Sequence, residues 1–595
     1  MLPGIVLSSL AMVIAVAALL TLRRIDCAFR FDRRAVAFAV LAFVSMSLLL
    51  KAIVMDVNAK GETVSGAAVY GDAGYHAIII NSFALTDNIP PQDPTFAGVP
   101  LGYHFLADFL AAIMVVLGMD FRVAMQLGAI VPATAALSFI YALAVRLLDS
   151  RKAGVFACLL VVFSGGLGFL DAYSDFSGSG IGLLEFLGSV HTDYSYFDHQ
   201  GGLANMFETG FGAARATIAG LAPALAAVLL LLIAFMEDRR ELLLPIGVAA
   251  GLLPMLQVHM FMALSVFVVV SVLAVKGLTW LRELALFSLI TLALALPALA
   301  GPAAGYVSSG TPRINIGWAE DEAVPLTKSL GFDIGSYPVV PLLGYSLEEP
   351  DRIASFWLRN LGFFGLLLLA GLLPADRLGK GMFLGAFAVF LLANTIQFQP
   401  LEFDNIKLFY FFLTLSSLPA ADALRRLWDA HTVGMLLAVI LLLLSTATGV
   451  LALLFNLDTR YVNYGPEDYV VGEWVRKNTP AKAVFLTSDY AMHPVPNIAG
   501  RAVVEGYRGW LWTHALNITP RDEAVAAIYE AHSEDEVRRY LNEYGIDYVF
   551  IGPAERGSRQ FKVNESFFDS SPLFEKVYDR AFDRGRVKIF RVRAS

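Results

Sequence analysis

The first group of residues that suits chemistry is an acidic and an imidazole side chain one helical turn apart. Asp72 and His76 lie in the segment 70–76, ahead of the apolar run 77–85. Side chains four residues apart share one face of a helix, so we expect both to point the same way. A carboxylate there acts as a general base or hydrogen-bond acceptor for an incoming hydroxyl or amide. A simple helix cap is the alternative for Asp72.

A second group combines acidic, amide and basic side chains at the start of an apolar segment. Asp404, Asn405 and Lys407 immediately precede the run 408–424. A cation and an amide at a membrane edge suit the phosphate of a lipid. The alternative is a lysine whose stem follows apolar surface while its ammonium pairs with Asp404 or Glu402.

Further candidates are aromatic, imidazole and guanidinium groups near the ends of apolar segments. A histidine here is either packed and hydrogen-bonded or part of a site, and an arginine at such a boundary either anchors the interface or binds phosphate in a fork. The aromatic and imidazole candidates are Tyr75, His76, Tyr103, His104 and His259, and the guanidinium candidates are Arg313 and Arg359.

The segment 191–202 carries four potential metal ligands, which are His191, Asp193, Asp198 and His199. Their spacing matches no established zinc pattern, so a polar loop with aromatic anchors is the favoured interpretation. The cofactor stays open, with a divalent cation as the candidate and no ligands assigned. The sequence contains no Walker loop, nucleophile elbow, zincin motif or dinucleotide fingerprint.

These groups belong to a chain with the composition of a membrane protein. Of its 595 residues, 57% are hydrophobic and 16% are charged, whereas soluble proteins average roughly 25% charged residues. The net charge is −8, so no overall basic field attracts nucleic acid. The composition excludes a soluble enzyme, a disordered protein and a nucleic-acid binder, and it makes the lipid bilayer a partner.

A helix needs about 20 apolar residues to cross the bilayer. About twelve such segments predict a polytopic α-helical membrane protein. The first is interpreted as a helix because it lacks the basic start of a signal peptide. The expected spans are 2–22, 35–54, 122–145, 153–171, 214–236, 242–257, 259–275, 282–301, 356–373, 382–397, 408–424 and 434–455.

Arginine and lysine gather in the short connections between these spans, which the positive-inside rule assigns to the cytoplasm. The long connections 55–121, 172–213 and 302–355 then lie on the outer face. Within the first, 101–118 is predicted as a half-inserted or amphipathic helix. Because long loops usually carry function, we expect the active site outside the cell membrane, on a transmembrane body formed by 1–457.

Residues 458–595 are mixed and charged, which predicts a soluble extracytoplasmic domain. Strands alternate there with helices, a pattern typical of an α/β fold. The expected helices are 467–477, 520–531 and 534–543, and the expected strands are 483–487, 546–551 and 587–592.

In their order along the chain, these features resemble the GT-C superfamily of integral membrane glycosyltransferases. They are the twelve spans, the acidic residue of a large first outer loop, the half-inserted segment with Leu-Gly-Tyr-His at 101–104, the Asp-Asn-x-Lys motif at 404–407 and the α/β tail. The similarity covers most of the chain, including the stretches 473–480 and 540–552 of the tail.

The resemblance implies transfer of a hexosyl or pentosyl group from a polyprenyl-phosphate donor to a glycan, lipid or protein acceptor. It maps the catalytic base onto Asp72 and the phosphate-binding motif onto residues 404–407. It also makes the tyrosine and histidine candidates ligands of the acceptor or sugar, and the two arginines ligands of the donor phosphate or lipid. A single displacement with inversion is our hypothesis for the mechanism. Asp72 is followed by Ala73 where protein O-mannosyltransferases carry Asp-Glu, and the Trp-Trp-Asp-Tyr-Gly signature of oligosaccharyltransferases is missing. The acceptor therefore stays open.

Two other hypotheses are a polytopic transporter or lipid flippase with an outer binding domain, and a non-catalytic outer receptor. A transporter predicts charged or broken helices at mid-membrane. The charged residues of this sequence gather instead at the edges of the spans. That distribution favours an enzyme with a surface-facing site.

Overall fold

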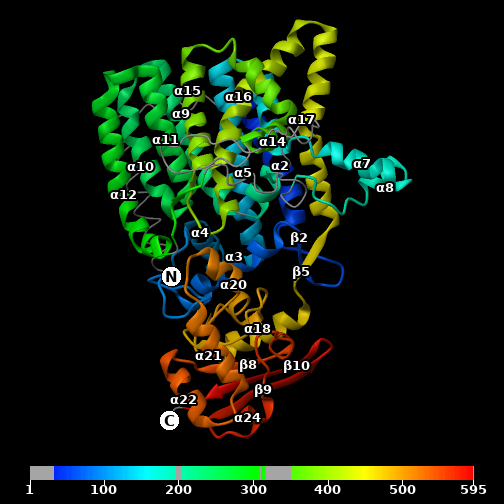
Figure 1. Cartoon of the computed structure of the whole chain (residues 1–595), viewed down its shortest axis with the longest axis vertical. Helices are drawn as coiled ribbons and strands as arrows, with labels where there is room; N and C mark the ends of the chain where they lie inside the picture. Colours follow the sequence, from blue (N-terminus) through cyan, green and yellow to red (C-terminus); the bar gives the residue numbers. More distant parts are fainter. Residues whose placement is uncertain (1–31, 196–202, 214, 309, 316–349, 594–595) are drawn as a thin grey trace.

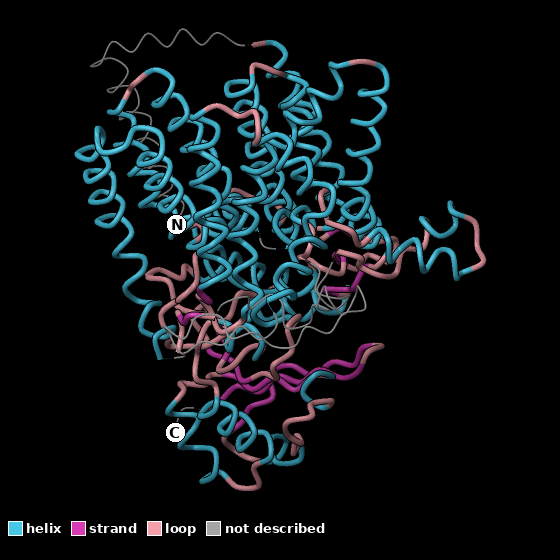
Figure 2. The backbone as a smooth tube through the Cα atoms, turned by 45° about the horizontal axis from the view of Figure 1, so that its top comes forward, coloured by secondary structure: helices cyan, strands magenta, loops and turns pink. Residues whose placement is uncertain are grey.

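The computed structural model describes residues 32–195, 203–213, 215–308, 310–315 and 350–593. Long helices form a bundle, and the C-terminal strands and short helices form a compact unit beyond one end of it (Figures 1 and 2). Two short helices, α7 (Phe169–Ser179) and α8 (Leu183–Leu187), project from the side of the bundle (Figure 1).

Seven helical stretches in the described ranges are long and apolar enough to cross a membrane. One of them is continuous through α11 (Val258–Lys276) and α12 (Leu281–Ser308). The others are α2 (Arg33–Ile53), α5 (Phe121–Leu148), α9 (Arg215–Glu237), α14 (Pro350–Leu372), α15 (Arg377–Thr395) and α17 (Thr432–Asp458). The chain is thus a helical membrane protein, although the count of twelve spans is not confirmed.

The differences from the expected spans have local causes. The expected span 153–171 becomes α6 (Arg151–Phe163), which stops before the glycine pair at 165–166, where Gly166 has a φ of +71°. The expected span 242–257 becomes α10 (Leu243–Leu252), which tightens into a 3₁₀ turn at Pro254. Helix α16 (Ile406–Ala430) covers 408–424, and the expected span 2–22 lies outside the described residues.

Between α2 and α5 the chain forms the short elements that line the site. They are β1 (Asp56–Val57), β2 (Thr63–Gly66), α3 (Tyr70–Thr86) and α4 (Leu106–Val116). Helix α4 occupies the segment expected to be half-inserted and is shorter than a full span. Strand β2 also pairs antiparallel with β5 (Arg460–Tyr464) just after α17, so the two sides of the expected boundary at 457/458 share a small sheet. That boundary stays a prediction.

The C-terminal unit contains a five-stranded mixed sheet in the order β7-β6-β8-β10-β9. Strands β6 (Val484–Leu486), β7 (Ala502–Val503) and β8 (Tyr548–Ile551) run parallel, and β9 (Phe574–Phe582) and β10 (Gly585–Val592) form an antiparallel hairpin. The helices are α18 (Pro466–Asn478), α19 (Pro494–Asn497), α20 (Arg508–Thr513), α21 (Thr519–Glu530), α22 (Glu534–Glu543), α23 (Pro553–Arg556) and α24 (Glu565–Ser570).

The C-terminal unit is fastened to α3 by buried amides. Asn81 donates through Nδ2 to the Asn497 carbonyl at 2.5 Å, and Asn497 donates through its own Nδ2 to the Gly74 carbonyl at 3.0 Å. Gly500 approaches so closely that a Cβ there would lie 2.5 Å from the Asn81 carbonyl oxygen. This junction fixes α20 relative to α3.

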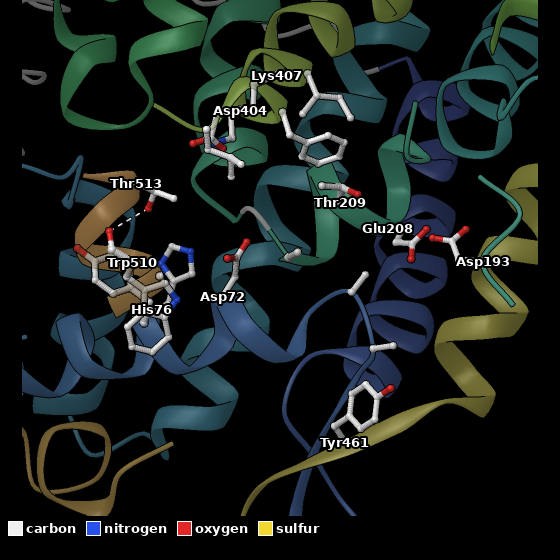
Figure 3. Close-up of a pocket in the computed structure, with 18 of the residues that line it drawn as sticks. Asp72, His76, Asp193, Glu208, Thr209, Asp404, Lys407, Tyr461, Trp510 and Thr513 are labelled. Carbon is white, nitrogen blue, oxygen red and sulfur yellow. Dashed lines mark hydrogen bonds and ion pairs between the residues drawn. The ribbon is translucent and has the colours of Figure 1, made fainter. Parts of the chain in front are cut away.

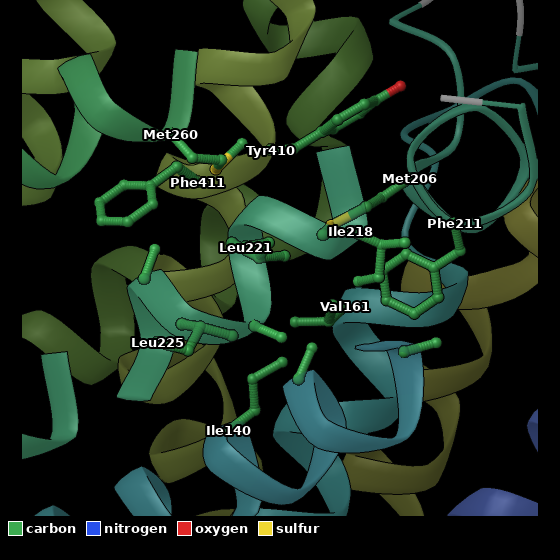
Figure 4. Close-up of a cluster of buried hydrophobic side chains, with 14 of the residues drawn as sticks. Ile140, Val161, Met206, Phe211, Ile218, Leu221, Leu225, Met260, Tyr410 and Phe411 are labelled. Carbon is green, nitrogen blue, oxygen red and sulfur yellow. The ribbon is translucent and has the colours of Figure 1, made fainter. Parts of the chain in front are cut away.

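Apolar side chains from α5, α6, α9 and α16 form the bundle core (Figure 4). Phe211 and Met206 extend into this core from a π-helical segment, η1 (Met206–Ala213), which precedes α9. The packing anchors η1, whose polar residues face the cavity described below.

Candidate active site

A cavity of about 700 Å³ lies between the helix bundle and the C-terminal unit, where α3, η1, the start of α16 and α20 meet (Figure 3). Its walls are rich in polar and aromatic side chains. Those lining it include Asp72, Tyr75, His76, Tyr103, His191, Asp193, Glu208, Thr209, Asp404, Lys407, Tyr461, Trp510, Thr513 and His514. Six of the sequence-predicted site residues therefore share one cavity.

Asp72 projects into this cavity from the first turn of α3. The helix begins at Tyr70 and has no side-chain cap, so Asp72 does not serve as the N-cap. Its side chain is exposed to the cavity, and desolvation raises the pKa of the carboxyl despite the opposing charges of His76 and Lys407. The positive end of the α3 dipole favours the ionised form at this position.

Lys407 and Asp404 form an ion pair with 2.5 Å between Nζ and Oδ1. Both are partly buried and both line the cavity. Burial alone would raise the pKa of Asp404, but the Lys407 charge and hydrogen bond lower it below the ordinary value. An ammonium has three donors, so this pair leaves Lys407 able to bind an anion as well.

Asn405 does not line the cavity. Its Nδ2 donates to the Ala393 carbonyl at 3.2 Å and to the Ile396 carbonyl at 2.5 Å, and its Oδ1 accepts the Phe398 N–H at 3.3 Å. The buried amide holds the turn between α15 and α16. We therefore leave Asn405 out of the proposed phosphate site.

The two predicted arginines also lie outside the cavity lining. Arg359, on α14, forms an ion pair with Asp171 of α7. Arg313 donates from Nε to Gln397 Oε1 at 2.8 Å, in a two-stranded pairing of β3 (Arg313–Ile314) with β4 (Ile396–Gln397). Both cations tie connecting segments together, and neither enters the proposed site.

Among the described residues, three histidines line the cavity, which are His76, His191 and His514. His76 bonds through Nδ1 to Asp108 Oδ2 at 2.8 Å, and His514 lies 3.4 Å from the hydroxyl of Tyr75 through its Nδ1. Burial lowers the pKa of His514 to about 4. The imidazole of His514 is therefore uncharged at neutral pH.

Two further histidines that the sequence singled out, His104 and His259, are buried outside the cavity lining. His104 stacks on Tyr103 with 3.8 Å between ring centroids, and burial holds the pKa of its imidazole well below the ordinary value. His259 lies 3.2 Å from Gln257 Oε1 through its Nδ1. Neither lines the cavity, so their assignment to sugar or acceptor binding stays a prediction.

Helix α20 supplies residues that sequence reasoning did not place in the site. Trp510, Thr513 and His514 reach the cavity from the C-terminal unit, more than 400 residues along the chain from Asp72. Trp510 packs against Tyr75 with ring centroids 5.2 Å apart. The aromatic run at 507–512 was a visible signal, but the contact with α3 depends on the tertiary fold.

At the opposite end of the cavity, Glu208 of η1 lies beside Asp193 (Figure 3). Asn456 donates to Glu208 at 2.6 Å, and burial followed by the charge of Asp193 raises the pKa of Glu208 well above its ordinary value. In the parts of the chain described, no three His, Cys, Asp or Glu side chains are close enough to hold a metal ion. Residues 196–202 of the loop 191–202, including Asp198 and His199, lie outside those parts.

Comparison with known proteins identifies a similar fold among solved structures. No protein-family model and no curated protein matches the sequence. Among solved structures, the chain is similar to the apo oligosaccharyltransferase of Archaeoglobus fulgidus, with a TM-score of 0.51 and 13% identity over 89% of this chain and 70% of that one. The chain has the GT-C fold.

The same archaeal enzyme tethered to an acceptor peptide gives a TM-score of 0.49, with 13% identity over 88% of this chain and 70% of that one. At 13% identity the likeness to the apo enzyme concerns the fold and not individual residues. The predicted fold class, a helical membrane protein with a C-terminal α/β domain, is confirmed in part, without the count of twelve spans.

Proposed function

We propose that this GT-C protein is a membrane glycosyltransferase. It moves a hexosyl or pentosyl group from a polyprenyl-phosphate-linked donor to a glycan, lipid or protein acceptor. The observation that carries the proposal is the shared cavity of Asp72 and Lys407, a carboxylate and a cation from different elements at one end of a membrane bundle. A transferase needs these two opposite functions at one reacting centre.

Lys407 serves the departing group in this scheme. When the bond between the anomeric carbon and the donor phosphate breaks, negative charge grows on the phosphate oxygens. A fixed ammonium stabilises that charge in the transition state. Asp404 holds Lys407 in place.

Asp72 serves the acceptor. Its carboxylate accepts the proton of the attacking group while the new glycosidic bond forms from the opposite face of the sugar. The result is one displacement with inversion of the anomeric centre. The aromatic rings of Tyr75, Tyr103 and Trp510 line the cavity close by and suit the apolar face of a sugar ring.

The cavity is proposed to open on the outer face. Basic residues that pair with acidic ones lie at the other ends of the bundle helices, including Arg146 with Glu237 and Lys152 with Asp429. The positive-inside rule assigns that end to the cytoplasm. The C-terminal unit and the cavity then lie outside, where the energy for transfer comes from the phosphate bond of the donor.

The direct test compares Asp72→Asn with the wild type. Purified protein in lipid is offered radiolabelled polyprenyl-phosphate mannose, glucose and arabinose, with a membrane extract as acceptor. We expect Asp72→Asn to reduce transfer by about 10²–10⁴-fold, the usual contribution of a general base. Donor binding should be retained, because the substitution changes only one oxygen.

Asp87→Asn is the matched control. Asp87 ends the same helix in the left-handed conformation, which asparagine tolerates well, and it lies outside the cavity. Asp87→Asn should transfer sugar at the wild-type rate. Equal transfer by wild type and Asp72→Asn would remove Asp72 from the chemistry.

A further inference from the structure

Behind the cavity wall, three helices contribute a continuous buried chain of charged and titratable groups. His76 Nδ1 of α3 lies 2.8 Å from Asp108 Oδ2 of α4, and Arg215 of α9 donates from Nη2 to the other oxygen of Asp108. His76, Asp108 and Arg215 are 2%, 1% and 2% exposed. Only His76 of the three lines the cavity.

This chain determines which nitrogen of His76 carries the proton. The carboxylate of Asp108 pairs with the Arg215 guanidinium, and a carboxylate accepts hydrogen bonds only. The Nδ1 of His76 must therefore be the donor to Asp108, and in the neutral ring the lone pair is on Nε2. Among the described residues the His76 ring has no second hydrogen-bond partner, so Nε2 remains available to the cavity.

Arg215 keeps this arrangement rigid. Its Nη1 donates to the Met125 carbonyl of α5 at 3.1 Å, and its charge balances Asp108 where water does not reach. A buried ion pair is costly compared with apolar packing, so its presence is explained better by a need for orientation than by stability.

A second buried histidine–carboxylate pair in the same chain lacks the free nitrogen. His493 Nε2 lies 3.2 Å from Glu555 Oε1, while its Nδ1 accepts the Val495 N–H at 3.2 Å. Both ring nitrogens are occupied, and the ring lies outside the cavity lining. In the His493 pair, therefore, no ring nitrogen is left for a substrate. In the His76 pair, Nε2 is left.

We propose that His76 is a catalytic proton acceptor, oriented by Asp108 and Arg215, and that the acceptor substrate carries a hydroxyl group. This inference rests on the proposed function. In the transfer step the acceptor O–H bond breaks and its oxygen bonds to the anomeric carbon. The carbon–oxygen bond to the donor phosphate breaks, and its electron pair leaves with the phosphate.

The proton moves first to the Asp72 carboxylate and then to Nε2 of His76, which lies one helical turn further along the same face of α3. The imidazolium so formed is stabilised by Asp108 and later releases the proton to water in the cavity. Asp72 is thereby returned to its ionised form. A hydroxyl group suits this path because its oxygen attacks with a localised lone pair while its proton is removed, whereas the nitrogen lone pair of a neutral amide is delocalised into the carbonyl and is a poor nucleophile.

The experiment compares wild type with His76→Asn and His76→Ala, using polyprenyl-phosphate mannose, glucose or arabinose as donor. Asparagine keeps an N–H near the position of Nδ1 for Asp108 and removes Nε2. We expect His76→Asn to lower kcat by about 100-fold or more, with the donor KM changed less than about threefold. Added imidazole should restore part of the activity of His76→Ala. His431→Asn, which keeps a good N-cap on α17, should match wild type.

Two acceptor probes test the substrate class in the same assay, octyl glucoside and a peptide containing Asn-Val-Thr. We expect transfer to the glucoside, or to water as the simplest O–H acceptor, and none to the asparagine amide. Transfer to the amide alone would overturn the hydroxyl assignment.

The remaining outcomes are also decisive. An active wild type with His76→Asn within twofold in kcat would overturn the role of His76 and leave the proposed function standing. A wild type that cleaves none of the donors would overturn the proposed function, and the inference with it. If the variants fail to fold, ¹⁵N-histidine NMR of the wild type in bilayers decides, because a neutral His76 with its proton on Nε2 contradicts the relay.

Discussion

Lys407 has two partners in the proposed reaction, Asp404 and the donor phosphate. In the structure it binds Asp404, and in the proposed reaction it also faces the donor phosphate. The ion pair was one alternative interpretation of the sequence, and the structure shows that pair directly. The two roles are compatible, since the paired carboxylate orients the cation that the phosphate meets.

We predict that Lys407→Gln lowers kcat/KM for a polyprenyl-phosphate sugar by about 10- to 100-fold, because the charge on the departing phosphate loses its counterion. Transfer kinetics with the purified variant measure the effect. The double variant Asp404→Asn/Lys407→Gln removes the uncompensated carboxylate and should remain equally slow. Recovery of the wild-type rate in the double variant would show that Lys407 serves only to neutralise Asp404.

For single residues, the sequence predicted which residue types belong to the site better than which way their side chains point. Asp72, His76 and Lys407 reach the cavity because they lie in the N-terminal turns of α3 and α16, and these two helix ends meet at the cavity. The neighbouring Asn405 points into the turn instead, since its amide satisfies carbonyls that α15 leaves unpaired. Motif spacing cannot distinguish a residue that faces substrate from one that holds its loop.

Among the elements, α20 depends for its position on the docking of the C-terminal unit. It reaches the cavity because the C-terminal unit docks on α3 through Asn81, Asn497 and the close approach of Gly500. Gly500 has a φ of +68° and no room for a side chain. The backbone at Gly500, which does not line the cavity, therefore helps to position the α20 residues that do.

We predict that Gly500→Ala lowers the Tm and reduces transfer, because the added methyl group would lie 2.5 Å from the Asn81 carbonyl oxygen. Gly545→Ala is the matched control, since Gly545 has a φ of +60° and nothing within 4 Å of the added Cβ. Both variants lose roughly 1–2 kcal/mol from the left-handed backbone. Thermal unfolding should show the larger loss for Gly500→Ala, and equal losses would argue against tight docking.

A pH-dependent carboxyl lies next to α20. Burial and then the neighbouring Asp522 raise the pKa of Glu505 to about 9, above its ordinary 4.5. A raised carboxyl pKa stabilises the fold while the group is protonated in both states, below pH 4.5, and this contribution is lost as the pH rises toward 9. The Tm should therefore fall across that range.

We predict that Glu505→Gln reduces this fall and makes the protein more stable than wild type at about pH 8, because the amide never ionises. Tm values measured from about pH 5 to pH 9 test the sign. Glu543→Gln, at an exposed position of α22, should reproduce the wild-type pH dependence. A Glu505→Gln curve parallel to wild type would place the titrating group elsewhere.

Element by element, periodicity and apolar length recovered the long helices and the main C-terminal strands. They failed where backbone geometry intervenes, as at the glycine pair that ends α6 and at Pro254 after α10. They also missed β7, which is two residues long, and β9, whose largely exposed side chains lack a buried alternating face. Short and edge strands are defined by their partners, which a single sequence does not display.

For the whole molecule, the arrangement of bundle, cavity and C-terminal unit explains why the fold resemblance was visible in the sequence. The order of apolar segments, first-loop carboxylate, late basic motif and α/β tail is set by topology, and the same topology produces the GT-C fold. The composition of the cavity is specific to this chain. Sequence order therefore predicts the architecture, and the identity of the acceptor depends on side chains that only the folded chain brings together.

The central claim is that the whole molecule cleaves a polyprenyl-phosphate sugar. The most direct measurement incubates the purified wild-type protein in lipid with labelled polyprenyl-phosphate mannose, glucose and arabinose, and records both the released polyprenyl phosphate and the sugar product. We predict that one donor is consumed, that product and phosphate carrier appear in equal amounts, and that the product has the inverted anomeric configuration. Consumption of none of the donors, with the protein folded, would contradict the account, and a product with retained configuration would contradict its single displacement.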